Sequence, residues 1–193
     1  MEFSLQEEKR RVRRELKETA SHFSEYYVAE ASRAVCEKVL QSSEFREAAV
    51  IFGYLSFRSE ISIDAVLEEA LRLGKTVAVP WIVSQNEMQA ARLVTLQDLP
   101  PDRYGIRTVP EPVEIISPDR IDLLFVPGAG FTKMGHRMGR GAGYYDRFLA
   151  QTRGFRLGIA CDKLLREKIP VGVYDQPVEA LVTETKFIYC TGV

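Results

Sequence analysis

The chain lacks a long hydrophobic segment and a marked excess of charge of either sign. Its longest apolar runs, such as residues 121–127, are far too short to span a bilayer, and its first residues lack a charged-then-apolar export signal. Lys and Arg number 26 against 27 Asp and Glu, so the molecule has no overall field that would draw it to nucleic acid or anionic lipid. We therefore expect a cytoplasmic protein that binds neither membranes nor nucleic acid.

Cysteine and histidine are also scarce. The cysteines Cys36, Cys161 and Cys190 are scattered, and no Cys-x-x-Cys pair is present that would indicate zinc or a redox dithiol. Neither histidine, His22 or His136, has a sequence setting that argues for a Cys–His catalytic pair. We expect the three cysteines to be buried, reduced thiols.

What the chain does have is the composition of an ordinary folded domain. Its 193 residues are 46% hydrophobic, 27% charged and 10% aromatic, which is enough apolar material for a substantial core. We find no internal repeat and no linker long enough to divide the sequence. A single domain over residues 1–193 is therefore expected.

Helical and strand-like segments alternate along the sequence. The first forty residues lack Pro and Gly and carry apolar residues at helical spacing, which predicts two helices, or one broken near residues 21–24. Ser62 is expected to cap a helix that Gly74 ends. The alternation predicts an α/β fold, a three-layer α/β/α domain with a mostly parallel central sheet. The expected helices after the first forty residues are 63–73 and 143–151, and the expected strands are 48–55, 75–80, 88–96, 121–126, 156–160 and one or two over 180–190, with a long irregular connection near 100–118.

Six glycines lie between residues 128 and 143, directly after the expected buried strand. Glycine lets backbone N–H groups surround phosphate oxygens, and the start of a following helix adds partial positive charge. Arg137 and Arg140 supply planar donor forks for phosphate, and Asp146 offers a hard oxygen ligand for Mg²⁺. A single Gly-x-Gly would more often mark a turn, but this pattern is denser. It matches neither the classical P-loop nor the dinucleotide fingerprint.

The stretch Gly135 to Leu149 resembles the signature of the 5-formyltetrahydrofolate cyclo-ligase family, together with the run 125–128 before it. Weaker matches stand in the family's order at residues 9–13, 59–61, 110–112 and 174–177. The resemblance thus covers nearly the whole chain, and only its central motif is highly specific.

The resemblance implies an ATP- and Mg²⁺-dependent conversion of 5-formyltetrahydrofolate to 5,10-methenyltetrahydrofolate, with release of ADP and phosphate, in a monomeric enzyme. A formamide is a poor electrophile because nitrogen donation deactivates its carbonyl. In such enzymes the γ-phosphoryl group of ATP goes to the formyl oxygen, N10 closes the ring, and phosphate leaves. Catalysis of this kind depends on positioning and charge neutralisation, and it needs no side-chain nucleophile.

The resemblance also implies roles for individual residues. Arg140, Lys9 and Arg13 are the expected catalytic residues, and Asp146 and Asp175 match the family's Mg²⁺ ligands. The positions that match its ATP contacts are Lys9, Arg13, Arg137, Met138, Gly139, Arg140, Gly141, Ala142, Gly143, Tyr144 and Tyr145. The positions that match its folate contacts are Leu55, Glu60, Arg140, Gly141, Ala142, Gly143 and Tyr144.

The residues alone leave plainer interpretations open for several of these positions. Lys9 and Arg13 share one helical face, which by itself is more typical of a solvated surface among balancing glutamates. Glu60 by itself would be a surface charge, although a carboxylate suits the donor edge of a pterin. Asp175 by itself is equally well a turn residue.

Two positions depart from the family's usual pattern. Trp81 stands where a basic residue is common, and Thr132 stands where an aspartate is frequent, so the pocket wall and the loop cap are expected to differ there. Trp81, together with Phe57, Met88 and Tyr104, either lines the folate pocket or belongs to the core.

Two other kinds of protein remain as alternatives. One is a sugar-phosphate isomerase or acyl-CoA transferase, which would use the glycine-rich segment for a phosphate without needing ATP. The other is a non-catalytic protein whose basic N-terminal helix contacts RNA, against which the near-neutral charge argues.

Overall fold

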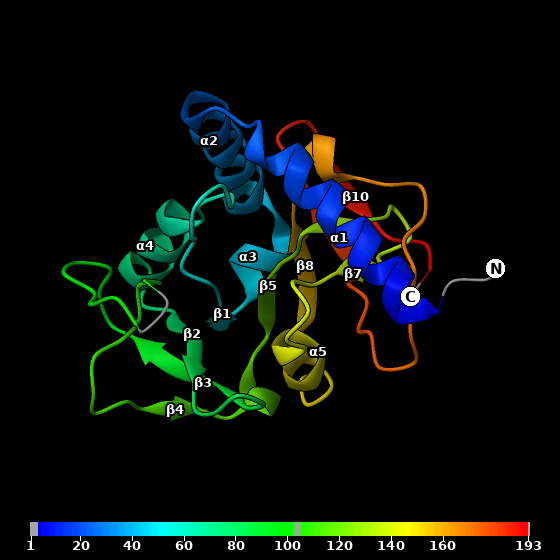
Figure 1. Cartoon of the computed structure of the whole chain (residues 1–193). Helices are drawn as coiled ribbons and strands as arrows, with labels where there is room; N and C mark the ends of the chain where they lie inside the picture. The colour runs from blue at the N-terminus through cyan, green and yellow to red at the C-terminus, as the bar shows by residue number, and fades with distance from the viewer. Residues whose placement is uncertain (1–3, 103–104, 193) are drawn as a thin grey trace.

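The computed structural model describes residues 4–102 and 105–192. Its centre is a sheet of eight strands in the order β10-β9-β8-β5-β1-β2-β3-β4 (Figure 1). Strands β9, β8, β5, β1 and β2 are parallel neighbours, whereas β10 at one edge and β3 and β4 at the other are antiparallel. The predicted mostly parallel α/β sheet is thereby confirmed. The strands are β1 (Val50–Phe52), β2 (Thr76–Ile82), β3 (Met88–Leu93), β4 (Ile115–Ile116), β5 (Leu123–Pro127), β8 (Phe155–Ile159), β9 (Ala180–Val182) and β10 (Phe187–Tyr189).

Helices cover both faces of the sheet. In β5, Leu123 and Phe125 join the core formed with α1 to α4, whereas Leu124 and Val126 join the core formed with α5. This period-two alternation places helices on opposite sides of the strands, as the three-layer prediction requires. In Figure 1, α2 and α4 lie on one side of the strands and α5 on the other. The helices are α1 (Leu5–Ser21), α2 (Glu25–Gln41), α3 (Ser43–Glu47), α4 (Asp64–Arg72) and α5 (Tyr144–Leu149), with 3₁₀ turns η1 (Pro118–Arg120) and η2 (Asp162–Leu164).

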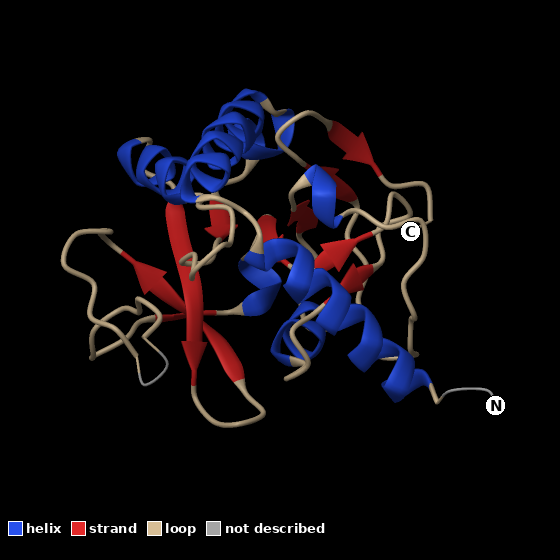
Figure 2. Cartoon of the chain, turned by 45° about the horizontal axis from the view of Figure 1, so that its top comes forward, coloured by secondary structure: helices blue, strands red, loops and turns tan. Residues whose placement is uncertain are grey.

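Helix α1 is the helix that begins beside the N-terminus in Figure 2, and it contacts η2 near the C-terminal end of the chain. It packs on a small second sheet made of β6 (Gly130–Phe131) and β7 (Arg137–Met138). The side chain of Leu16 comes so close to Gly130 that a Cβ atom there would lie 2.8 Å from it. Glycine at position 130 therefore lets α1 approach the segment that follows β5.

Serine caps begin the first two helices. Ser4 forms a capping box with Glu7, and the side chain of Ser24 accepts from the Tyr27 N–H, so the predicted break near residues 21–24 is confirmed. The N-cap of α4 is Ile63, one residue later than predicted, but the Ser62 hydroxyl accepts from the N–H of the first helical residue, Asp64, at 3.3 Å. The backbone of Ser62 is fixed against α2, since its N–H donates to the Ser32 hydroxyl at 2.9 Å.

The closing strands expected over residues 180–190 are present as β9 and β10, and in the turn between them the Thr183 N–H donates to the Lys186 carbonyl at 2.8 Å. The expectation that all three cysteines are buried needs correction. Cys36 and Cys161 are buried as predicted, whereas Cys190 is only half-buried because it follows the last strand at the sheet edge. Burial raises the pKa of Cys36 to about 11 and that of Cys161 to about 12, so both thiols stay protonated.

No helix in the described part of the chain is long and apolar enough to cross a membrane.

Candidate functional site

A cavity of about 530 Å³ lies at the carboxyl ends of the parallel strands β1, β2 and β5. This is where open α/β sheets bind their ligands. Its wall combines the segment after β1, the end of β2 with the start of β3, the loop before residue 109, and the glycine-rich segment after β5. The lining residues are Tyr54, Leu55, Phe57, Glu60, Pro80, Trp81, Ile82, Val83, Met88, Asp102, Ile106, Arg107, Thr108, Pro127, Gly128, Arg137, Gly139, Arg140, Ala142, Gly143, Tyr144, Tyr145 and Asp146.

Residues 139–143, which we call the glycine loop, follow β7 directly. None of their five backbone N–H groups donates to another group within the described residues. Two of the loop's carbonyls are bound by arginines: Nε of Arg13 donates to the Gly139 oxygen at 2.9 Å and Nη2 of Arg147 donates to the Ala142 oxygen at 2.8 Å. The loop therefore turns carbonyls toward protein cations and leaves amides for a ligand with acceptor oxygens.

Glycine is required at two points in this loop. Gly141 has φ +111° and Gly143 has φ +71°, which place both in the left-handed region that side chains disfavour. Ala142 between them is not in the positive-φ region, so its side chain is tolerated there. These turns let successive N–H groups converge on one ligand.

Arg137 and Asp146 form a largely buried ion pair beside the loop. Nη2 of Arg137 lies 2.6 Å from Oδ1 of Asp146, and the two side chains are 3% and 21% exposed. The Nε group of Arg137 is buried and has no partner among the described residues. Because Arg137 lines the cavity, this unpaired donor is a position where a ligand oxygen can bind.

Arg140 and Glu60 form a second pair, which spans the cavity mouth. Nη2 of Arg140 donates to Oε1 of Glu60 at 2.6 Å, while the other carboxylate oxygen accepts from the Phe57 N–H at 2.8 Å. Burial raises the pKa of Glu60, and the positive charge of Arg140 acts against that rise. Glu60 is therefore a carboxylate held in place at the edge of an apolar cavity.

Lys9 on α1 pairs with Asp175, which lies near the other end of the chain. Lys9 is buried, and Asp175 also accepts from the Gly172 N–H at 2.7 Å. The next residue, Gln176, donates its N–H to Asp146 at 3.2 Å. These contacts bring Lys9, Asp175 and Asp146 to the same end of the site as Arg137.

The structure thus gathers the residues expected from the sequence, with differences in detail. Lys9, Arg13, Met138, Gly141 and Asp175 surround the cavity without lining it. The side chain of Met138 is buried in the core, so a ligand can reach this residue only through its backbone.

The sequence left open whether four large side chains line the pocket or belong to the core, and the structure describes three of them. Phe57, Trp81 and Met88 line the cavity; Met88 is also a buried core residue, and Trp81 packs against the core. Tyr104 lies outside the described residues. Thr132 is buried, and its hydroxyl accepts from the His136 N–H at 3.3 Å, so it holds the turn between β6 and β7.

Sequence reasoning missed two arginines of the site. Arg107 lines the cavity and binds both oxygens of Asp64 at 2.8 and 2.9 Å. Arg147 bonds to Ala142 and to Asn86 on the β2–β3 hairpin. No local signal could assign Arg107, whereas Arg147 stood in the recognised motif without an assigned role.

The carboxylates of the site suit a magnesium ion only if a bound ligand supplies further oxygen atoms to the ion. Among the described residues, no cluster of three or more His, Cys, Asp or Glu could hold a metal alone. Asp146 binds its protein partners through Oδ1 and Asp175 through Oδ2, so the other oxygen of each makes no hydrogen bond within the described residues. Mg²⁺ commonly takes one or two carboxylates and completes its shell with water and substrate phosphates. Asp146 and Asp175 fit that pattern.

Comparisons with known proteins agree with one another. A model of the 5-formyltetrahydrofolate cyclo-ligase family matches residues 5–184. A mouse 5-formyltetrahydrofolate cyclo-ligase is 28% identical over 189 residues, which cover 91% of this chain and 93% of the mouse protein. The enzyme of that name from Escherichia coli strain K12 is 32% identical over 148 residues, which cover 72% of this chain and 80% of the relative. The solution structure of Aquifex aeolicus 5,10-methenyltetrahydrofolate synthetase has a TM-score of 0.84 at 27% identity and covers 95% of this chain and 93% of its own.

Proposed function

Because the chain belongs to the 5-formyltetrahydrofolate cyclo-ligase family, we propose that it uses ATP and Mg²⁺ to convert 5-formyltetrahydrofolate to 5,10-methenyltetrahydrofolate. ADP and phosphate are the other products. The observation that carries the proposal is the glycine loop, whose amides donate to no group within the described residues and four of whose residues line the cavity together with Glu60 and Arg137. Family membership separates the chain from the isomerase, transferase and RNA-binding alternatives.

The folate occupies the apolar part of the cavity. Glu60 accepts hydrogen bonds from the donor edge of the pterin, and its pairing with Arg140 and Phe57 holds the carboxylate ready for that contact. Phe57 and Trp81 supply flat apolar surface for the rings. Leu55 and Tyr144 line the same space.

The triphosphate of ATP binds along the glycine loop. Its oxygens accept from the free amides of residues 139–143 and from the unpaired Nε of Arg137. Lys9 and Arg13 add positive charge from α1, where Arg13 already touches the Gly139 carbonyl. These groups neutralise the phosphate oxygens as charge moves during transfer.

Asp146 and Asp175 would hold a magnesium ion that accompanies the nucleotide. Such an ion would supply positive charge that neutralises the phosphate oxygens. The chain's own contribution is to fix the two carboxylates, each through one oxygen, by means of Arg137 and Lys9.

The reaction proceeds in two steps. The formyl oxygen attacks the γ-phosphorus, the bond to ADP breaks, and an imidate-like phosphate forms on the folate. N10 then attacks the activated carbon and loses its proton, and the C–O bond breaks to release phosphate and leave the methenyl bridge. Arg140 belongs to the glycine loop and its guanidinium reaches Glu60 across the cavity lining, so it is the side chain best placed to neutralise the transferring group.

The test is direct. Purified protein is incubated with 5-formyltetrahydrofolate, Mg²⁺ and ATP, and the near-ultraviolet band of the conjugated methenyl product is followed. The band should appear only when all three are present. Folded protein that yields no band would defeat the proposal.

We further propose that residues 1–193 act as one domain, as a monomer, in the cytoplasm. Sedimentation of the active protein at the mass of a single chain, 21.9 kDa, tests the monomer.

A further inference from the structure

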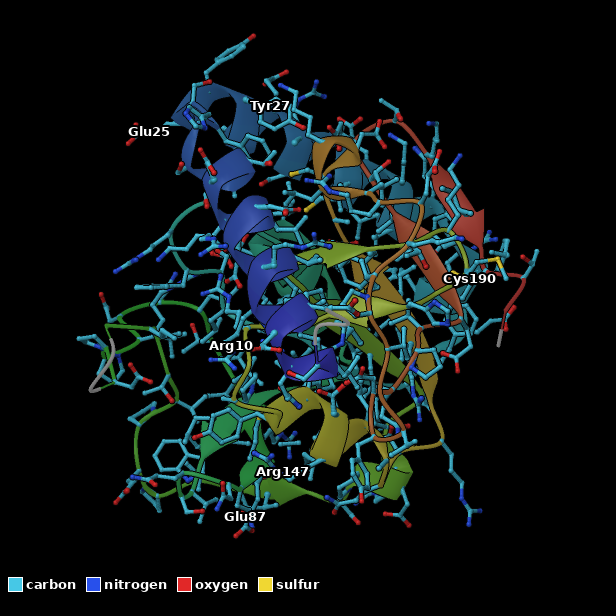
Figure 3. All side chains as sticks on the ribbon, turned by 45° about the vertical axis from the view of Figure 1, so that its right-hand side comes forward. Arg10, Glu25, Tyr27, Glu87, Arg147 and Cys190 are labelled. Atoms are coloured by element: carbon cyan, nitrogen blue, oxygen red, sulfur yellow. The ribbon has the colours of Figure 1, made fainter. Side chains whose placement is uncertain are left out.

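Arg147 lies outside the cavity, on the exposed side of α5, yet it bonds to two of the cavity's walls. Its Nε group donates to the Asn86 carbonyl at 2.7 Å and its Nη2 group donates to the Ala142 carbonyl at 2.8 Å. Figure 3 shows Arg147 beside the β2–β3 hairpin, close to the labelled Glu87. One guanidinium therefore joins the hairpin to the glycine loop.

Both joined segments line the cavity. The hairpin contributes Val83 and Met88, and the loop contributes Ala142 and Gly143. A second bond runs parallel to the first, because the Tyr144 hydroxyl donates to the Ser84 carbonyl at 3.0 Å. The guanidinium also stands 5.5 Å from the centre of the Tyr144 ring. These contacts set how far apart the two walls stand.

The bond to Ala142 has a consequence for the loop's amides. A peptide unit is planar, and its C=O and the next N–H point in opposite directions. With the Ala142 carbonyl held by Arg147, the N–H of Gly143 must point away from that guanidinium. At the other end of the loop, Arg13 binds the Gly139 carbonyl at 2.9 Å. The N–H of Arg140, in the same peptide unit, must therefore point away from Arg13.

We propose that Arg147 is a positioning residue, which orients the free amides of the glycine loop and holds the β2–β3 hairpin against them. The proposal rests on the proposed function for its kinetic consequences, but not for its structural ones. A planar fork with fixed donors suits two backbone carbonyls, and a lysine ammonium cannot reproduce that geometry.

The first test is kinetic. Arg147→Ala should raise the KM for ATP and for 5-formyltetrahydrofolate about tenfold each, with kcat within about threefold of the parent, because binding groups are misplaced while the reacting groups remain. Arg147→Lys should recover only part of the loss. The matched control is Arg153→Ala, which removes another exposed arginine just beyond α5.

The second test does not need activity. Hydrogen exchange of the hairpin amides should become faster in Arg147→Ala, above all at Val83 and Ser84, which bond to the Glu87 carbonyl. The melting temperature should stay within about 2 °C, since an exposed arginine contributes little to global stability.

Together, the kinetic and exchange tests distinguish the positioning role of Arg147 from the proposed function of the chain. A parent protein that lacks cyclo-ligase activity, with the hairpin exchange still changed by Arg147→Ala, would refute the proposed function and leave the positioning role standing. An active parent whose variant shows unchanged KM values and unchanged exchange would overturn the positioning role alone. A variant that loses melting temperature in proportion to activity would also overturn it, because Arg147 would then be a general structural residue.

Discussion

The two arginine–carboxylate pairs on either side of Gly139 differ in their access to water. The guanidinium of Arg137 is enclosed, with a side chain 3% exposed, whereas that of Arg140 is 59% exposed. A charge sealed inside the protein depends on its partner, while a charge at a cavity mouth exchanges its partner easily. The first pair therefore contributes to the stability of the fold as well as to the site, whereas the second can be changed at little cost to stability.

Replacing Arg140 should give the largest effect of the site. Arg140→Ala should lower kcat about 100-fold or more, as loss of a group that stabilises developing charge does elsewhere, with a free energy of unfolding lowered by less than about 1 kcal/mol. Steady-state kinetics and urea unfolding of the same sample measure both. Arg92→Ala is the control, because Arg92 forms a similarly open pair with Glu114 at 3.1 Å. Parallel loss of stability and activity would give Arg140 a structural role instead.

Breaking the largely buried Arg137–Asp146 pair should lower the free energy of unfolding. Asp146→Ala leaves the Arg137 charge without its carboxylate, and the unfolding free energy should fall by about 3 kcal/mol. Urea unfolding measures the change, with Glu114→Ala as the exposed counterpart that should cost less than about 1 kcal/mol. If both variants lose the same amount, the distinction between the two pairs is wrong.

The metal requirement tests the carboxylates separately. Asp146→Asn and Asp175→Asn should each raise the Mg²⁺ concentration for half-maximal activity about tenfold, since each loses a charged oxygen ligand. A magnesium titration at saturating ATP measures this, and Asp119→Asn, an exposed aspartate in η1, serves as the control. A variant whose metal dependence is unchanged removes its residue from the ligand set.

The smallest expected effect is on the pH dependence of stability, and it comes from Glu60, the partner of the exposed Arg140. Burial raises the folded-state pKa of Glu60 above its usual 4.5, so the folded protein binds more protons there than the unfolded chain does. Its contribution to stability is therefore present at pH values below 4.5 and declines as pH rises through the folded pKa. Glu60→Gln should gain stability relative to the parent as pH rises from 4.5 toward 7, by less than about 1 kcal/mol. Urea unfolding across that range measures the difference, and a constant difference would contradict the raised pKa.

Sequence reasoning did well where the signal was local. The run of strands and helices followed from periodicity, and the break expected near residues 21–24 coincides with the Ser24 cap of α2. The sequence did not predict the shortest strands, because β4, β6 and β7 have two residues each and carry no periodic signal. Helix α3 also escaped, and it has only five residues.

The candidate site was predictable as a set of residues and not as an arrangement. The glycine-rich segment indicated a phosphate site, and the family resemblance added Lys9 and Asp175. No spacing in the sequence could show that these two residues, 166 positions apart, form an ion pair, or that Lys9 is buried. Long-range pairing depends on how α1 docks across the finished sheet. The roles of the individual residues stay predictions.

The docking of α1 also bears on the order in which the protein is made. Lys9 emerges early from the ribosome, but its partner Asp175 is added 166 residues later, and the Gly139 carbonyl that Arg13 binds comes 126 residues after that arginine. Helix α1 therefore cannot make its contact with Asp175 until nearly the entire polypeptide has been synthesised. An unfinished chain lacks the Lys9–Asp175 ion pair, so this end of the site is completed last.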